Sequence, residues 1–220
     1  MKFSLIMALY ILIYTPVVDV FAESPVVDNE WENVSANEGV IVFKQKVQGS
    51  ELIKVKTRVI INAPIRKILS ILDDAPHRHE WIPYLEESKI LKVFSVTDKL
   101  EYSLFAAPWP ASNRDFVYQL SLTYSDMQKT VYDMKSVDSK NMPEQEGIIR
   151  ADLIESQYTL SVIDKNQTNV ELVFYADPKG WLPNWIVNII QKVLPYRMLR
   201  NLRDRAEGAT QNAGSSAKNF

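Results

Sequence analysis

The sequence predicts an α+β domain in which a long helix follows a series of β-strands. Between residues 40 and 175, apolar side chains recur at every second position in short segments, which is typical of strands with one buried face. From about residue 184 to 206 the apolar repeat changes to that of an amphipathic helix. Because most strands precede this terminal helix, the pattern favours an α+β architecture.

Before the main series of strands, the pattern predicts a short helix, a hairpin and a second helix. Residues 31–39 form a brief segment that we expect to be helical. The two strands of the hairpin are expected at 40–43 and 55–61. Pro64 at a first helical position, with an apolar stripe behind it, predicts a helix that ends at residues 73–74.

After a loop rich in His, Pro and Trp, further strands are expected to form an antiparallel meander. They cover residues 87–94, 99–106, 116–124, 131–137, 148–154, 157–163 and 170–175. Pro195 falls inside the pattern of the terminal helix and removes one backbone donor there, so we expect a kink at that point.

The composition limits the classes of function. A net charge of −2 without a basic stripe argues against a nucleic-acid partner. The absence of cysteine excludes disulfides, thiolate nucleophiles and thiolate metal sites. We expect neither a metal nor a cofactor, because His77 and His79 are the only histidines and their spacing suits a metal site poorly. No catalytic residue is expected, because the sequence has no phosphate-binding glycine loop and no known nucleophile motif.

Residues 1–22 have the pattern of a secretory signal peptide. Lys2 precedes an apolar run at 3–14, and 20–22 offer small or apolar residues before a cleavage site. The run is shorter than the ~20 residues that span a bilayer, so a retained anchor is the less favoured alternative. We expect an exported protein, periplasmic or secreted, with one domain at 23–206 and a disordered polar tail at 207–220.

Four motifs in the chain are similar to those of one known family. They are Asn141 to Arg150 (NMPEQEGIIR), Asp177 to Trp185 (DPKGWLPNW), Pro108 to Pro110 (PWP) and Arg114 to Val117 (RDFV). With these motifs, residues 31–206 resemble the START domain family of the Bet v 1-like superfamily. The resemblance implies a helix-grip fold, in which a curved antiparallel sheet wraps around the long C-terminal helix and encloses a cavity. It also implies a non-enzymatic protein that binds a single lipid and transfers it between membranes.

Aromatic residues with charged neighbours mark the expected ligand site. The aromatic and apolar candidates are Trp81, Tyr102, Phe105, Trp109, Tyr118, Trp185 and Ile189. The polar candidates are Glu101, Arg114 and Arg150, for which a structural ion pair is the alternative.

Glu101 occupies the position of an acidic residue that faces an arginine in sterol-binding relatives. Leu120 stands where those relatives carry the arginine, which argues against a sterol-specific site. An unpaired buried carboxylate costs on the order of several kcal/mol. Either another cation such as Arg150 compensates Glu101, or a ligand does, or Glu101 is not buried.

The resemblance also implies a lid over the cavity mouth, formed by the terminal helix and the loop at 108–113. Trp109, Trp181 and Trp185 suit a membrane interface. Residues 192–205 carry five positive charges and one negative charge, a local charge of +4 that favours an anionic membrane. A solvated helix face is the alternative for this basic stretch.

We expect a monomer that docks transiently on membranes. Two alternative functions would use the same cavity. One is a cyclase-like enzyme with Glu101, Tyr102 or Tyr118 as acid or base, and the other is a ligand-gated sensor.

Overall fold

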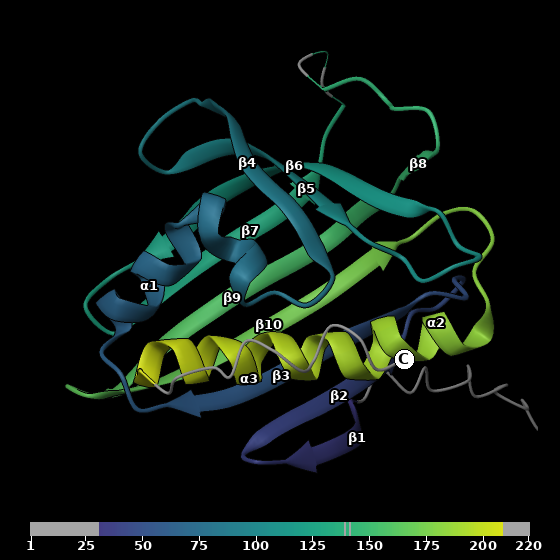
Figure 1. The fold of residues 1–220 in the computed structure, drawn as a ribbon. Helices are drawn as coiled ribbons and strands as arrows, with labels where there is room; N and C mark the ends of the chain where they lie inside the picture. The colour runs from purple at the N-terminus through teal and green to yellow at the C-terminus, as the bar shows by residue number, and fades with distance from the viewer. Residues whose placement is uncertain (1–30, 139, 141, 209–220) are drawn as a thin grey trace, which may run out of the picture.

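The protein folds into one strongly curved β-sheet with a long C-terminal helix across its concave face (Figure 1). The computed structural model describes residues 31–138, 140 and 142–208. The strands are β1 (Glu32–Asn37), β2 (Val40–Lys46), β3 (Ile53–Ile61), β4 (Leu85–Val93), β5 (Asp98–Phe105), β6 (Asn113–Ser125), β7 (Lys129–Ser136), β8 (Ile148–Arg150), β9 (Asp152–Asp164) and β10 (Gln167–Asp177). The expected signal peptide lies outside the described residues, as does the expected tail from residue 209 onward.

The sheet has the strand order β1-β2-β3-β10-β9-β7-β6-β5-β4, and its neighbours on this path pair antiparallel. Because β10 pairs with β3, the last strand of the chain joins the N-terminal hairpin to the meander. Side chains alternate along each strand, as the apolar pattern predicts. In β3, for example, Thr57, Val59 and Ile61 are buried, whereas Arg58 and Ile60 face solvent.

Two helical segments lie between the hairpin and β4. Helix α1 (Ile65–Asp73) begins directly after Pro64, one residue later than expected, and buries Ile68 and Leu72. A 3₁₀ helix, η1 (Ala75–Glu80), follows in the loop rich in His and Pro. This short helix matters because it carries a buried arginine into the centre of the protein.

The C-terminal helix consists of three consecutive parts. They are α2 (Asn184–Asn188), the π-helix η2 (Ile189–Val193) and α3 (Leu194–Glu207). The N–H of Leu194 bonds to the carbonyl of Ile189 five residues earlier, so the widened turn comes immediately before Pro195. Since proline lacks a donor, this turn accommodates the break that the sequence predicts. Gly208 ends the helix with φ +76°.

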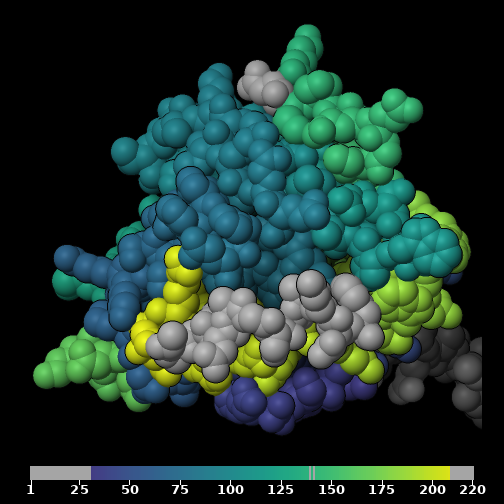
Figure 2. All heavy atoms as spheres, in the orientation of Figure 1, coloured from purple at the N-terminus to yellow at the C-terminus, as the bar shows by residue number. Residues whose placement is uncertain are grey.

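The main core forms between α3 and the concave face of the sheet. Leu199, Leu202 and Ala206 of α3 are fully buried there, against Leu160 and Leu172 among others. Burial of each large side chain stabilises the fold by about 1.5–3 kcal/mol. Figure 2 shows the C-terminal helix, in yellow, between the purple N-terminal strands and the teal region around α1 and β4. The C-terminal helix therefore covers the concave face of the sheet on this side of the molecule.

Two elements differ from the expectations. Residues 31–39 are not helical, because β1 pairs antiparallel with β2 through a two-residue turn. Glu38 and Gly39 in that turn have φ +49° and +75°, the left-handed conformation that tight hairpins require. The expected strand at 148–154 is interrupted at Ala151, because β8 pairs parallel with β6 while β9 pairs with β10.

Within the described residues, no helix combines the length and the apolar character needed to cross a membrane.

Candidate functional site

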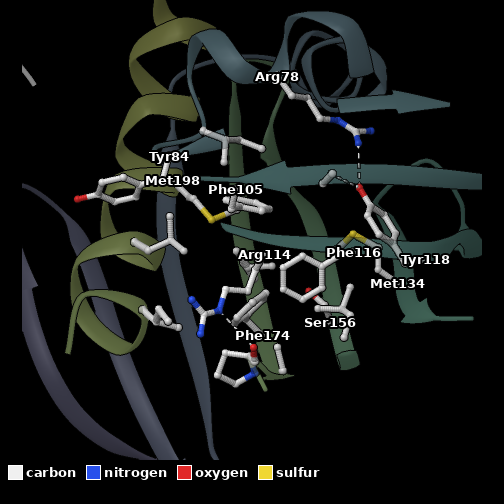
Figure 3. Close-up of a pocket in the computed structure, with 18 of the residues that line it drawn as sticks. Arg78, Tyr84, Phe105, Arg114, Phe116, Tyr118, Met134, Ser156, Phe174 and Met198 are labelled. Atoms are coloured by element: carbon white, nitrogen blue, oxygen red, sulfur yellow. Dashed lines mark hydrogen bonds between the residues drawn. The ribbon is translucent and has the colours of Figure 1, made fainter. Parts of the chain in front are cut away.

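A cavity of about 180 Å³ lies between the concave face of the sheet and the C-terminal helix. Most of its lining is apolar, from inward-facing side chains of β5, β6, β7, β9 and β10 and from the helix (Figure 3). Phe105 and Phe116 form part of this wall, with their rings edge to face and 5.8 Å between centroids. The cavity is therefore suited to an apolar ligand.

Four buried polar residues form what we call the inner polar cluster: Arg78, Glu101, Ser103 and Tyr118. The two terminal nitrogens of Arg78 donate to the two carboxylate oxygens of Glu101, and Nη1 also lies 3.3 Å from the Tyr118 hydroxyl. The Tyr118 hydroxyl donates to Glu101 Oε2 at 3.1 Å, and Ser103 Oγ lies 3.2 Å from the Tyr118 hydroxyl oxygen. Figure 3 shows the Arg78 guanidinium directed at the Tyr118 hydroxyl.

The position of Arg78 follows from the end of α1. The carbonyl of Leu72, in the last turn of that helix, accepts bonds from Arg78 Nε at 2.9 Å and Nη2 at 2.6 Å. Burial acts to lower the pKa of Arg78, but its interactions with Tyr118 and Glu101 outweigh burial and the pKa is raised. The guanidinium therefore stays charged, and it neutralises Glu101, which is 0% exposed.

Two further polar side chains enter the cavity from β9. Ser156 and Tyr158 lie two residues apart on the same face of the strand and both are buried. Ser156 donates to the Val173 carbonyl at 3.0 Å. The Tyr158 hydroxyl has no hydrogen-bond partner among residues 31–138, 140 and 142–208. Burial raises the pKa of Tyr118 and of Tyr158, so both hydroxyls remain protonated.

Arg114 ties together the two loops at the mouth of the cavity. Its guanidinium donates to the carbonyl of Ser112 in the β5–β6 loop. It also donates to three carbonyls of the β10–α2 loop, at 3.4 Å to Pro178, 3.3 Å to Lys179 and 3.1 Å to Trp181. Burial lowers the pKa of Arg114. Arg114 thus holds the β5–β6 loop against a backbone segment that lies 64 to 67 residues further along the chain from the arginine.

Arg150 does not compensate Glu101. It forms a bidentate pair with Asp115, at 2.7 Å from Nε and 3.0 Å from Nη2, on the other face of the sheet. The cation that Glu101 requires is Arg78. No local pattern in the sequence indicates this pairing, because the two partners lie 23 positions apart and on different elements.

The residues predicted to contact a ligand separate into three groups. Those that line the cavity are Trp81, Phe105, Arg114, Tyr118 and Ile189. Glu101 lies behind the wall, bonded to Arg78 and Tyr118. Those that the structure places away from the cavity are Tyr102 and Arg150, on the opposite face, and Trp109 and Trp185, which are 90% and 44% exposed.

Sequence reasoning missed Arg78, Ser156 and Tyr158. For the two β9 residues a signal existed, since Ser156 and Tyr158 share the strand face of the buried Leu160. The histidines take local roles: His77 Nδ1 lies 2.8 Å from the Asp74 carboxylate, and His79 Nδ1 lies 2.8 Å from a backbone carbonyl. In the part of the chain that the structure describes, no group of three or more His, Asp or Glu side chains could hold a metal.

Comparison with known proteins places this geometry in a family. The START domain model matches residues 19–208. An uncharacterized protein of Pseudomonas aeruginosa is 28% identical over 178 residues, 81% of this chain and 87% of that protein. Phosphatidylcholine transfer protein of Bos taurus is 23% identical over 162 residues, 72% of this chain and 75% of that protein.

The solved structure of a STAR-related lipid transfer protein from Xanthomonas axonopodis superimposes with a TM-score of 0.70. It is 27% identical, and the match covers 80% of this chain and 98% of that one. The curved antiparallel sheet and its C-terminal helix thus confirm the helix-grip fold. From the match over residues 19–208, this chain belongs to the START domain family.

Proposed function

We propose that this protein binds one lipid molecule inside its cavity and transfers it between membranes without catalysing a reaction. The observation that carries the proposal is the apolar cavity between the sheet and the C-terminal helix, whose polar groups are few and gathered mainly around Arg78 and Tyr118. Such a combination is typical of ligand sites. The relatives support it, since two are named phosphatidylcholine transfer protein and STAR-related lipid transfer protein.

The size of the cavity implies that part of its wall moves. Its volume of about 180 Å³ is below the ~300–1,000 Å³ of typical ligand pockets, so a lipid has to displace some of the lining. The parts of the wall outside the sheet ladder include the β5–β6 loop and the helix segment 184–193. No residue of the π-helix in that segment is fully buried. These two segments are the proposed lid.

The inner polar cluster favours binding over the cyclase-like alternative. An acid or base catalyst has to present a free proton or lone pair to the substrate. Glu101 instead accepts bonds from Arg78 and Tyr118, and the Tyr118 proton is committed to Glu101. Tyr102, the third candidate, lies on the opposite face and accepts a bond from Gln145 at 3.2 Å.

Membrane docking is supported by exposed tryptophans near the cavity mouth. Trp109 lies in the β5–β6 loop, whereas Trp181 and Trp185 follow β10, and they are 90%, 67% and 44% exposed. Arg114 holds these two loops together, so Trp109 and Trp181 belong to one connected region. Exposed indoles partition favourably to the membrane–water interface.

The basic helix contributes less charge than its sequence indicates. Arg205 pairs with Glu80 at 2.7 Å, and Arg203 lies 3.9 Å from the carboxylate of Glu38, both acidic residues from outside this helix. Ion pairs of this kind neutralise part of the local positive charge. We therefore assign docking mainly to the tryptophans and only secondarily to anionic lipid headgroups.

The first test identifies the ligand. The chain is expressed in a bacterium and analysed by native mass spectrometry, where a monomer carrying one lipid is expected. Emptied protein is then offered fluorescent lipids in vesicles. A protein that is isolated empty and takes up no lipid would refute the proposed function.

The second test addresses transfer. Trp109→Ser combined with Trp181→Ser is expected to slow lipid transfer between vesicles about tenfold while leaving the bound lipid in place. Trp31→Ser is the matched control, because Trp31 packs on Lys56 at the N-terminal edge of the sheet.

The role of anionic headgroups in docking is tested with vesicles of two compositions. If the wild type binds neutral and anionic vesicles equally, electrostatic attraction does not contribute to docking.

We also propose that residues 1–22 direct export to the periplasm or the exterior. The support is the sequence pattern of that segment. Expression of the full chain followed by cell fractionation and mass measurement tests it. The expected product is a chain that starts at Glu23 outside the cytoplasm, and an intact chain retained in the membrane would contradict the proposal.

A further inference from the structure

The deep end of the cavity holds a cation, but no hydrogen-bond donor of that cation is free. Arg78 has five N–H groups, and five bonds account for them. Two go to the Leu72 carbonyl, two to Glu101 and one to the Tyr118 oxygen. Glu101 also cancels the charge of Arg78. An anionic ligand group would therefore meet neither a free donor nor a net positive charge here.

The neighbouring hydroxyl groups are partly committed as well. The single proton of Tyr118 goes to Glu101 Oε2 at 3.1 Å. Ser103 then donates to the Tyr118 oxygen at 3.2 Å, since Tyr118 has no second proton to give. Ser156 donates to the Val173 carbonyl. The oxygens of Ser103 and Ser156 thus keep capacity as acceptors but offer no donor.

Two buried donors remain for a ligand. Of the side chains that line the cavity and are at least nine-tenths buried, two have a polar atom without a partner in the described part of the chain. They are the Tyr158 hydroxyl and the Trp81 indole N–H, in residues that are 7% and 2% exposed. Both groups are neutral. Neither atom is among the fully buried side-chain atoms that lack a partner in the described part of the chain, so each is reached from the cavity, where an acceptor on the ligand can bond to it.

Arg114, the other arginine of the cavity, adds neither a positive charge nor a free donor at the deep end. Each of its three nitrogens donates to a backbone carbonyl of the mouth loops. In Figure 3 its guanidinium points away from the pair formed by Arg78 and Tyr118. Any anion bound by Arg114 would have to lie at the mouth.

We infer that the ligand is an uncharged lipid with a hydroxyl group, which accepts a hydrogen bond from Tyr158 and donates one to a serine oxygen of the cavity. Both halves of the hydroxyl then find a partner. A phosphate or ionised carboxylate at the same place would be desolvated without compensation. This inference rests on the proposed lipid-binding function and names the lipid class.

The experiment compares chain-matched ligands on emptied full-length protein. The probes are hexadecanol, its methyl ether, hexadecanoate at pH 8 and a lysophosphatidate with the same chain, each titrated below its aggregation limit. Tryptophan fluorescence and native mass spectrometry report binding. Hexadecanol is expected to bind about tenfold more tightly than its ether and than either anion.

The variant that tests the residue is Tyr158→Phe, which removes one oxygen and keeps the ring. It is expected to weaken the binding of hexadecanol about tenfold, or ~1.4 kcal/mol, and to weaken the binding of the ether as well, because the ether oxygen also accepts from Tyr158. Tyr102→Phe is the matched control, because Tyr102 is also buried but lies on the opposite face of the sheet, outside the cavity. Thermal unfolding checks that both variants keep the fold.

The outcomes separate the two proposals. If none of the four probes binds, the lipid-binding function itself fails. If hexadecanoate or the lysophosphatidate binds more tightly than hexadecanol, lipid binding stands and the uncharged class is overturned. If hexadecanol binds but Tyr158→Phe leaves its affinity unchanged, the assignment of Tyr158 is overturned.

Discussion

Arg78 and Glu101 form an ion pair in which the side chains are only 8% and 0% exposed. The partners come from different elements, since Arg78 lies on η1 and Glu101 on β5. Leu120, where the family resemblance places an arginine, is buried and lines the cavity instead. The charge of Glu101 is thus compensated from the helical side of the cavity and not from the neighbouring strand.

Removal of Arg78 alone is expected to destabilise the protein strongly. Arg78→Met leaves Glu101 buried without a cation, which costs about 3–5 kcal/mol of unfolding free energy. The double variant Arg78→Met with Glu101→Leu should lie within about 2 kcal/mol of the wild type, because no unpaired charge remains. Urea denaturation of the wild type, the two single variants and the double variant measures the coupling.

The control is the partly exposed pair of Arg58 and Glu171, at 2.8 Å. Arg58→Met should cost about 0–1 kcal/mol. If Arg78→Met lowers the free energy of unfolding by no more than Arg58→Met does, the buried pair contributes no more to stability than the partly exposed one.

Arg114→Gln is expected to loosen the cavity mouth. The four carbonyls that Arg114 holds would lose a charged donor, so hydrogen exchange should accelerate in the β5–β6 loop and in residues 178–183. Ligand release should accelerate in parallel. Arg150→Gln is the control, because it breaks a buried pair on the opposite face. If both variants change hydrogen exchange at the mouth equally, Arg114 does not specifically hold the two mouth loops together.

Gly180→Ala is expected to destabilise the β10–α2 loop more than Gly147→Ala destabilises its own turn. Gly180 has φ +63°, and a Cβ there would lie 2.7 Å from Cδ1 of Ile149. Gly147 has φ +80°, but a Cβ at that position would meet no atom within 4 Å. Alanine at 147 therefore adds only backbone strain of about 1–2 kcal/mol. The contact at Gly180 should add about 0.5–1.5 kcal/mol, because Cδ1 is the mobile end of the Ile149 side chain and can move away by leaving its preferred rotamer.

An Ile149→Ala background separates the steric contact at Gly180 from the backbone strain. If the steric contact matters, this background should reduce the cost of Gly180→Ala to that of Gly147→Ala in thermal or urea unfolding. An unchanged difference would assign the excess to backbone strain.

Asp98 is expected to make stability depend on pH in the acid range. Hydrogen bonds from Ser121, at 2.6 Å, and from Thr97 and Gln119 lower the pKa of Asp98. Because the folded pKa lies below the unfolded value of about 4, the stabilisation is present above about pH 4 and is lost as pH falls through the folded pKa. Asp98→Asn should remove this loss.

Urea denaturation between pH 7 and pH 3 provides the measurement. The free energy of unfolding should fall more steeply with acidification in the wild type than in Asp98→Asn. Parallel curves for the two proteins would show that Asp98 does not carry the effect.

Much of the fold follows from local pattern. Strands with clear alternation, such as 55–61, and the long terminal helix have a buried face that periodicity alone indicates. The segment 31–39 has no such alternation, and its strand forms only because β2 is available as a partner. Likewise, the break at Ala151 arises from pairing of β8 with β6, to which no local pattern refers.

The candidate site divides in the same way. Phe105, Arg114 and Tyr118 could be predicted because they stand on strands or beside motifs whose faces the sequence indicates. Arg78 could not, since a loop arginine has no periodicity that directs it to a carboxylate 23 positions away. Exposure of Trp109 also depends on how the β5–β6 loop folds, and exposure of Trp185 depends on how α2 packs, so the indoles alone do not specify it.

The α+β class, most strand positions and the terminal helix could be inferred from the amino-acid sequence, because they depend on side-chain spacing within a few residues. The identity of the cation that neutralises Glu101, the face that Arg150 occupies and the buried hydroxyl that remains free for a ligand emerge only in the folded chain. These are properties of contacts between distant segments. Charge compensation and donor availability depend on distances that tertiary packing sets.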